Sequence, residues 1–369
     1  MTLTKPFIWL LTWVLLTTGV FNSQAQNASS LGFSADYGFL FLHSQDVAPI
    51  GQGYPWSLGA EYGYWLLNDG YYENCRCYPK LGLSLSYHNY DNPQVLGFGI
   101  PLYGFLEPWY RLKGPLFLNL RGGVGLAWAS EPYHAETNPL NLSYSLPVSA
   151  FVMMGVGVGY APNLRWKFNL QARYNHLSNG GFREPNKGLN YPTLNFTTEY
   201  ALQPFDLATT QRAPFNPAES LKDFQFTLFA AGKAGGQIGE GANEENITYL
   251  VSGAAARYSH QVSRSSALVV GTSFINNQAY ARQIEKRGLN RNEDQVTLSA
   301  GHEFLLGKFR FAQLLGTYLY KDFHPTPGFF QRYTLDWQFL PNWQLGTGIK
   351  AHGHVGEFID VRLSYRFSL

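Results

Sequence analysis

His176 and Ser178 are the residues of this chain whose types and spacing are best suited to catalysis. They lie in the run His176-Leu177-Ser178-Asn179-Gly180, and Asn190 follows fourteen positions after the histidine. A serine hydroxyl is a poor nucleophile until a neighbouring base takes its proton, and histidine is suited to that task near neutral pH. The pair therefore predicts an esterase with Ser178 as nucleophile and His176 as base. The alternative is a chance His-x-Ser without catalytic meaning.

Asn190 is the best candidate for the group that orients the imidazole of His176. Its phase matches the apolar positions Pro192 and Leu194, so a hairpin would bring it beside His176 on the same face. A neutral amide can orient an imidazole through its carbonyl oxygen, although it stabilises the charged ring less than a carboxylate does. Glu184 is the alternative orienter.

The residues that follow the serine are candidates for stabilising an oxyanion. The side chain of Asn179 and the backbone amides of Gly180 and Gly181 can donate hydrogen bonds, and glycine permits a close approach of the substrate.

A strand must carry the catalytic pair. Between Trp166 and Ser178 the even positions are mainly apolar and include His176, whereas polar residues such as Lys167 and Arg173 occupy odd positions. Side chains of a strand alternate between faces, so His176 and Ser178 share the apolar face, roughly 6 to 7 Å apart along the backbone. That face would be the core of a soluble sandwich but the outside of a membrane barrel.

The N-terminus and the composition favour the membrane barrel. Lys5, an apolar stretch from Phe7 to Val20 and small residues up to Ala25 predict a signal peptide that is cleaved after Ala25. No later apolar run reaches the roughly 18 residues of a spanning helix. Aromatic residues make up 16% of the chain, charged residues only 14%, and glycines number 38, as alternating lipid-facing and lumen-facing positions would produce. The net charge of +2 argues against nucleic acid as a partner.

The same alternation recurs up to the last residue. From Ile359 to Leu369, apolar and aromatic residues interleave with polar ones. We therefore predict an all-β fold, an antiparallel transmembrane β-barrel of the outer-membrane type with an even number of strands, about 12 to 16 and best matched by 16. A soluble jelly roll is the alternative, but it would not need so many aromatic residues near strand ends.

The segments suggest four regions along the chain. These are a signal peptide (1–25), a barrel half that carries the motif (26–200), a long connection containing three prolines (201–223), and a second set of strands (224–369). The connection would be a plug, a long turn or a joint between two barrels. One barrel is favoured, because unpaired sheet edges within lipid would leave backbone groups without hydrogen bonds.

The strand of His176 is expected to be the seventh. If the chain starts in the periplasm, this strand runs outward, the short connection at 161–165 is a periplasmic turn, and the longer segment from Asn179 to Tyr191 is an external loop. Ser178 would then face the acyl chains of the outer leaflet.

The motif, continued through Pro185-Asn186-Lys187-Gly188-Leu189-Asn190, resembles the active-site segment of the lipid A 3-O-deacylases, the PagL-type acyloxyacyl hydrolases of outer membranes. The resemblance covers residues 31–200, and the second half resembles an extension of longer relatives. It implies that His176 and Ser178 are base and nucleophile on the lipid-facing side of a barrel. It also implies lipid A, or lipopolysaccharide of the outer leaflet, as substrate, with Arg183 and Lys187 as candidates for contacting its phosphates; ordinary solvation of the two charges is the alternative.

One position departs from better-known deacylases, which have a glutamate where this chain has Asn190. The asparagine is similar to that of the outer-membrane phospholipases A, which carry it at the same spacing and need Ca²⁺. The leading hypothesis is a lipid A deacylase without a cofactor. The rivals are a phospholipase A that uses Ca²⁺, and a non-catalytic barrel that serves as pore or scaffold.

Two other patterns predict less. Cys75 and Cys77 are separated by one residue, which is too close for an unstrained mutual disulfide, and a zinc site is improbable without a second cysteine pair. His352 and His354 form a His-x-His that suits a metal pair or, more commonly, a solvated loop.

Overall fold

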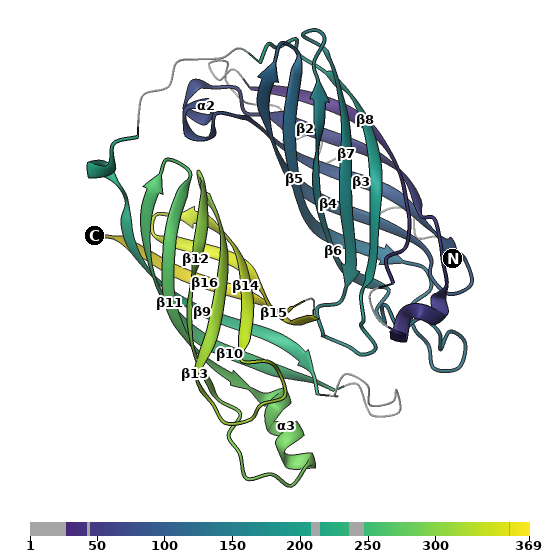
Figure 1. The fold of residues 1–369 in the computed structure, drawn as a ribbon, viewed down its shortest axis with the longest axis vertical. Coiled ribbons are helices and arrows are strands. Elements are labelled where there is room, and N and C mark those ends of the chain that lie inside the picture. The colour runs from purple at the N-terminus through teal and green to yellow at the C-terminus, as the bar shows by residue number, and fades with distance from the viewer. Residues whose placement is uncertain (1–26, 43–44, 208–214, 236–246, 354) are drawn as a thin grey trace, which may run out of the picture.

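Sixteen antiparallel strands in the described part of the chain form two closed barrels of eight strands each (Figure 1). The computed structural model describes residues 27–42, 45–207, 215–235, 247–353 and 355–369, and the predicted signal peptide lies outside them. The first barrel consists of β1 (Ala28–Gly38), β2 (Trp56–Trp65), β3 (Tyr78–Asn92), β4 (Gly97–Lys113), β5 (Leu116–Ala129), β6 (Val148–Tyr160), β7 (Trp166–Ser178) and β8 (Leu189–Ala201).

The second barrel has the same number of strands. It consists of β9 (Lys222–Ala234), β10 (Thr248–Ser263), β11 (Ser266–Asn277), β12 (Gln295–Leu306), β13 (Phe309–Lys321), β14 (Phe329–Leu340), β15 (Trp343–His352) and β16 (Val355–Ser368). Short helices occupy the connections: η1 (Gln45–Ile50), α2 (Asp69–Cys75), η2 (Pro217–Glu219) and α3 (Gln278–Lys286). No helix among the described residues is long and apolar enough to cross a membrane.

The prediction of a single barrel is wrong, although the favoured count of 16 strands is correct. β8 pairs back onto β1, from Ala201 opposite Ser30 to Thr193 opposite Gly38, and β16 pairs with β9 in the same antiparallel manner. Each half therefore satisfies its own edge strands. The requirement that no sheet edge remain unpaired in lipid excludes open sheets, but it does not distinguish one large barrel from two small ones.

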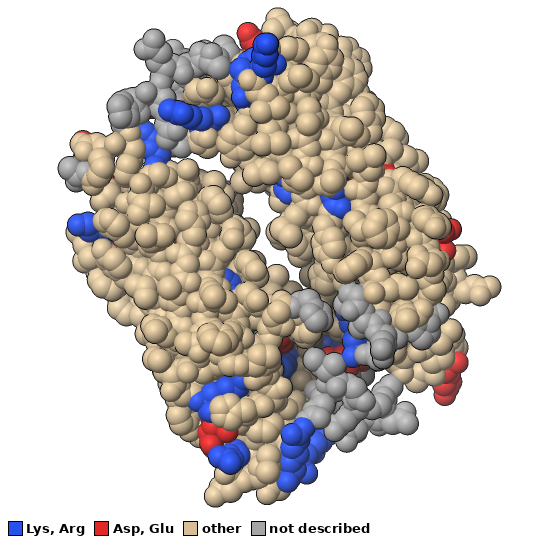
Figure 2. All heavy atoms as spheres, in the orientation of Figure 1, with Lys and Arg blue, Asp and Glu red and all other residues tan. Residues whose placement is uncertain are grey.

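The strands of both barrels place apolar side chains outside and polar side chains in the lumen. In β7, Trp166 and Leu170 are 42% and 50% exposed, whereas Lys167 and Gln171 are almost completely buried. The visible barrel walls are nearly free of charged residues (Figure 2). This is the arrangement of a barrel whose outer surface faces hydrocarbon.

Ion pairs and aromatic rings fill the lumen of the first barrel. The ammonium of Lys80 lies 2.9 Å from Glu107 and 2.6 Å from Glu199, and the guanidinium of Arg121 lies 2.7 Å from Glu61 and 2.9 Å from Glu107. These buried charges are compensated by one another, which is the condition under which charges are tolerated away from water.

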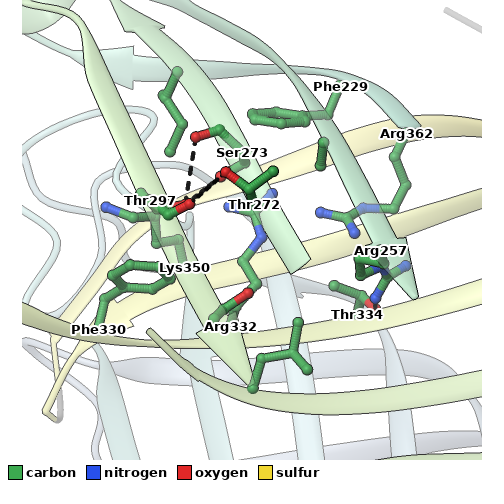
Figure 3. Close-up of a pocket in the computed structure, with 14 residues that line it drawn as sticks. Phe229, Arg257, Thr272, Ser273, Thr297, Phe330, Arg332, Thr334, Lys350 and Arg362 are labelled. Atoms are coloured by element: carbon green, nitrogen blue, oxygen red, sulfur yellow. Dashed lines mark hydrogen bonds between the residues drawn. The ribbon is translucent and has the colours of Figure 1, made fainter. Parts of the chain in front are cut away.

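The lumen of the second barrel contains a small cavity (Figure 3). It is lined by four cationic side chains, by hydroxyl groups and by apolar side chains such as Phe229 and Phe330. The cations have carboxylate partners: Arg257 pairs with Asp336, Arg332 and Arg362 share Asp360, and Lys350 pairs with Glu357.

Cys75 and Cys77 form a disulfide, so the expectation that they would not pair is wrong. Cys75 ends α2, and Arg76 between the two cysteines adopts a left-handed conformation with φ of 54°. This sharp turn sets the two Cα atoms 5.1 Å apart, within the usual span of a disulfide. The bond lies in the β2–β3 connection, at the barrel end opposite Ser178.

Candidate active site

The β7–β8 hairpin sets His176 directly opposite Asn190. The Nδ1 atom of His176 lies 2.6 Å from Oδ1 of Asn190. An amide oxygen can only accept a hydrogen bond, so with this amide orientation Nδ1 carries the proton and Nε2 is the basic nitrogen. The strand phase places both side chains on the same face: His176 is half-buried, and Asn190 beside it is buried.

Ser178 ends β7 two residues further along the same outer face. Its Oγ accepts a hydrogen bond from the backbone N–H of Gly180 at 3.0 Å and another from the side-chain amide of Asn186 at 3.1 Å. Two N–H groups therefore converge on the oxygen that is the candidate nucleophile. Donors in such a position can stabilise negative charge that develops next to that oxygen.

The loop between β7 and β8 is organised around Asn179. Its Oδ1 accepts from the backbone amides of Gly181 at 3.0 Å and Phe182 at 3.1 Å, while its Nδ2 donates to Ser145 Oγ at 3.1 Å and to the carbonyl of Arg183 at 2.6 Å. Of the three predicted oxyanion donors, Asn179 and Gly181 are thus hydrogen-bonded within the loop. The N–H of Gly180 alone among the three donates to Ser178 Oγ in the described contacts.

Asn186 was not among the residues predicted from the sequence to form the site. Its Oδ1 accepts from the amide of Asn179 at 2.9 Å, and its Nδ2 reaches Ser178. The signal that could have identified it is the Pro-Asn-x-Gly segment at 185–188, which was noted only for its resemblance to the deacylases. A side chain in an irregular loop has no strand phase from which its direction can be predicted.

Glu184, the alternative orienter, lies in the loop beside Asn186. Its carboxylate accepts the backbone N–H of Asn186 at 3.0 Å. Burial raises the pKa of the Glu184 carboxyl above its ordinary value, while that hydrogen bond and the charges of Lys187 and Lys233 oppose the shift. In the described contacts, the partner of the Nδ1 atom of His176 is Asn190.

Arg183 and Lys187, the candidates for contacting lipid A phosphates, lie in the same loop. The side chain of Arg183 is exposed, and its backbone carbonyl accepts from Ser145 Oγ at 3.0 Å. The backbone amide of Lys187 donates to the carbonyl of Leu142 at 2.9 Å. Both residues are thus anchored by their main chains beside Ser178.

The absence of a side chain at Gly188 leaves room for the imidazole of His176. Gly188 has a φ of 80°, and an ideal Cβ built on it would lie 2.7 Å from Cε1 of His176. A side chain at this position would both strain the backbone and collide with the ring.

A second serine–histidine pair lies inside the first barrel. Ser86 Oγ is 2.8 Å from Nε2 of His88, and the Tyr191 hydroxyl is 3.0 Å from Nδ1 of the same ring. Ser86 and His88 are buried in the lumen next to Phe151. This pair faces packed side chains, whereas Ser178 is on the outer surface where a lipid can reach it.

Only one histidine of the His-x-His pattern, His352, lies within the described residues. Nδ1 of His352 donates to the carbonyl of Phe329 at 2.9 Å, and its Nε2 lies 3.1 Å from the carboxylate of Glu357; His354 lies outside the described residues. In the described part of the chain, no three His, Cys, Asp or Glu side chains gather as a metal site would require.

The fold and the site together define a class, that of outer-membrane-type barrels with a serine beside a histidine–asparagine pair on the outer face. Residues 29–199 match the family model described as lipid A 3-O-deacylase (PagL), and residues 222–369 match the model of the acyloxyacyl hydrolase C-terminal domain. The chain belongs to this PagL family, with one matched domain in each barrel.

Solved structures that match the chain include the outer membrane enzyme PagL, which is 15% identical, covers 45% of this chain and 97% of its own, and has a TM-score of 0.34. Neisserial surface protein A is 13% identical over 47% of this chain and 95% of its own, with a TM-score of 0.32. A mutant porin of Rh. blastica is 12% identical over 92% of this chain and all of its own, with a TM-score of 0.22. No curated protein matches the chain.

Proposed function

We propose that this chain is a serine esterase of the bacterial outer membrane that removes an ester-linked acyl chain from lipid A. The observation that carries the proposal is the set of contacts on the outer face of β7 and β8. There, Asn190 holds Nδ1 of His176, and two N–H donors reach the oxygen of Ser178. The family match supports lipid A as the substrate.

The chemistry follows from these contacts. Nε2 of His176 takes the proton of Ser178 as Oγ attacks the ester carbonyl carbon, and the N–H groups of Gly180 and Asn186 beside Oγ stabilise the charge that develops on the carbonyl oxygen. His176 then returns the proton to the departing hydroxyl oxygen of the sugar. Water, deprotonated by the same imidazole, hydrolyses the acyl-enzyme and releases the fatty acid. No cofactor is required by these steps.

The strand order supports a site at the outer leaflet. β7 is the seventh strand, so in a chain whose first strand begins in the periplasm it ends, with Ser178, at the outer side. Lipid A of the outer leaflet would then present its ester bonds at the depth of Ser178, with its phosphates near Arg183 and Lys187.

Mass spectrometry of lipids tests the proposal. Lipid A and phospholipids are extracted from cells that express the parent chain, Ser178→Ala or His176→Ala, with the folded fraction of each checked by heat modifiability. We expect lipid A that lacks one acyl chain only with the parent. Unchanged lipid A with the parent, or full activity of either variant, would contradict the proposed function.

An assay with a chelator distinguishes a lipid A deacylase from a phospholipase A. Asn190, shared with the outer-membrane phospholipases that the motif also resembles, is the observation that favours a phospholipase A as second candidate. Purified protein is assayed on lipid A and on phospholipid, with and without a chelator. We expect hydrolysis of lipid A that persists in chelator; hydrolysis of phospholipid alone, lost on chelation, would favour the phospholipase.

A further inference from the structure

The loop that follows Ser178 is attached to the second barrel. The N–H of Ala234, the last residue of β9, donates to the carbonyl of Gly181 at 2.8 Å, and the hydroxyl of Thr248 donates to the carbonyl of Phe182 at 3.0 Å. In Figure 1 the end of β7 and the start of β8 lie toward the second barrel, near the end of β15. The two barrels therefore meet at the candidate active site.

The loop attaches to the second barrel where the pairing between β9 and β16 ends. These strands pair from Ser368 opposite Asp223 only as far as Asp360 opposite Ala231. Beyond that point β16 continues to Val355, but the N–H of Ala234 donates to the carbonyl of Gly181. An ideal Cβ on Gly181 would lie 3.2 Å from the carbonyl oxygen of Glu357 on β16, so the loop is next to both β9 and β16.

Close packing supplements the hydrogen bonds. An ideal Cβ on Gly180 would lie 2.5 Å from Cδ1 of Ile359 on β16, and one on Gly232 of β9 would lie 2.3 Å from Cε2 of Phe182. The absence of side chains at Gly180 and Gly232 is thus what lets the loop and the second barrel approach each other. Gly180 and Gly181 also have left-handed φ angles of 68° and 80°.

We propose that the second barrel is a positioning element of the active site, which holds the loop so that the N–H of Gly180 points at Ser178. The inference rests on the proposed function and assigns a role to the C-terminal domain. The fixed carbonyls of Gly181 and Phe182 are one and two residues from the Gly180 amide that contacts Ser178 Oγ. Catalytic donors must be held within about 0.5 Å of their productive positions, so release of the loop would slow the chemical step more than it would weaken binding of a long lipid.

Gly232→Ala and Thr248→Val test this role in the full chain. The alanine Cβ displaces Phe182, and the valine removes the hydroxyl donor while leaving a residue of similar size. The matched controls are Gly356→Ala, where a Cβ meets no atom within 4 Å, and Thr248→Ser, which keeps the donor. Ile359→Ala is compared with Val361→Ala, two residues further along the outer face, where the side chain is 64% exposed.

The readouts are kcat, KM and the rate at which a fluorophosphonate probe labels Ser178, each per heat-modifiable folded protein. We expect kcat and the labelling rate to fall about tenfold in Gly232→Ala, Thr248→Val and Ile359→Ala, with KM nearly unchanged and the controls at the parent level. Parent rates in all three test variants, with Ser178 still essential, would overturn the positioning role alone. Full activity of Ser178→Ala would overturn the proposed function and this inference together.

Discussion

Asn190 distinguishes a side chain that orients the base from one that takes part in bond formation. Its Oδ1 is 2.6 Å from Nδ1 of His176, so Asn190→Ala should release the imidazole while leaving Ser178 intact. We expect the hydrolysis rate to fall on the order of 10²-fold, less than in Ser178→Ala. Asn190→Glu should retain activity, because a carboxylate accepts the same hydrogen bond from Nδ1 of His176.

The comparison with Glu184→Ala makes the Asn190 prediction decisive. All variants are assayed at matched expression and folding, because a carboxylate near lipid carries a cost that depends on depth. Parent activity in Asn190→Ala, combined with loss in Glu184→Ala, would show that the acidic side chain of the loop orients the base.

Asn186 should contribute to the rate through its amide. Its Nδ2 donates to Ser178 Oγ at 3.1 Å, next to the donor of Gly180, so Asn186→Ala removes one of two N–H groups at the nucleophile. We expect kcat to fall by about 10²-fold with a smaller change in KM. Steady-state kinetics on a lipid A substrate measures both constants, and a change in KM alone would assign Asn186 to substrate binding.

At the scale of elements, the glycine that precedes β8 shapes the space around the base. Gly188→Ala should displace the His176 ring, which an added Cβ would meet at 2.7 Å, and should lower hydrolysis and probe labelling about tenfold. Gly307→Ala is the matched control, because Gly307 also has a left-handed φ, 67°, but its Cβ would meet nothing within 4 Å. Equal activity of the two variants would contradict a role for this packing.

The strands of the site could be predicted from the sequence because a strand has a fixed period. The alternation from Trp166 to Ser178 indicated which face His176 shares with Ser178, and the phase of Pro192 indicated that Asn190 would join them across the hairpin. The loop has no such period. Its contacts depend on left-handed glycines at 180, 181 and 188 and on a neighbouring barrel, so the hydrogen bond between Ala234 and Gly181 could not be predicted, and the only sequence signal for Asn186 is the Pro-Asn-x-Gly segment at 185–188.

At the scale of the whole molecule, the alternation of apolar and polar residues predicts how many strands there are, but it does not predict which strands pair to close a barrel. One barrel of sixteen and two of eight have the same period and the same satisfied backbone. The difference lies in two long-range pairings, β8 with β1 and β16 with β9. Complementary charges on non-adjacent strands of the first half, such as Arg121 on β5 and Glu61 on β2, come together only when that half closes by itself.

Arg121 should be important for the stability of the first barrel. It pairs with Glu61 and Glu107 in the lumen, and Arg121→Ala would leave these carboxylates with less compensation away from water. We expect the free energy of unfolding to fall by roughly 3 kcal/mol. Urea unfolding of the detergent-folded protein measures the change. Arg282→Ala, which removes an exposed pair with Glu285, serves as the control and should leave the transition unchanged.

The filled interior of the first barrel also bears on the permeability of the membrane. Trp65 and Trp109 are fully buried there, with ring centroids 5.2 Å apart, and Lys80 lies above both rings. As far as the described residues extend, side chains occupy the place that water occupies in a porin. The first barrel should therefore give no passage to small hydrophilic antibiotics, and planar bilayers that contain the protein should show no conductance through it. Step-like openings would show that the lumen can rearrange into a conducting path.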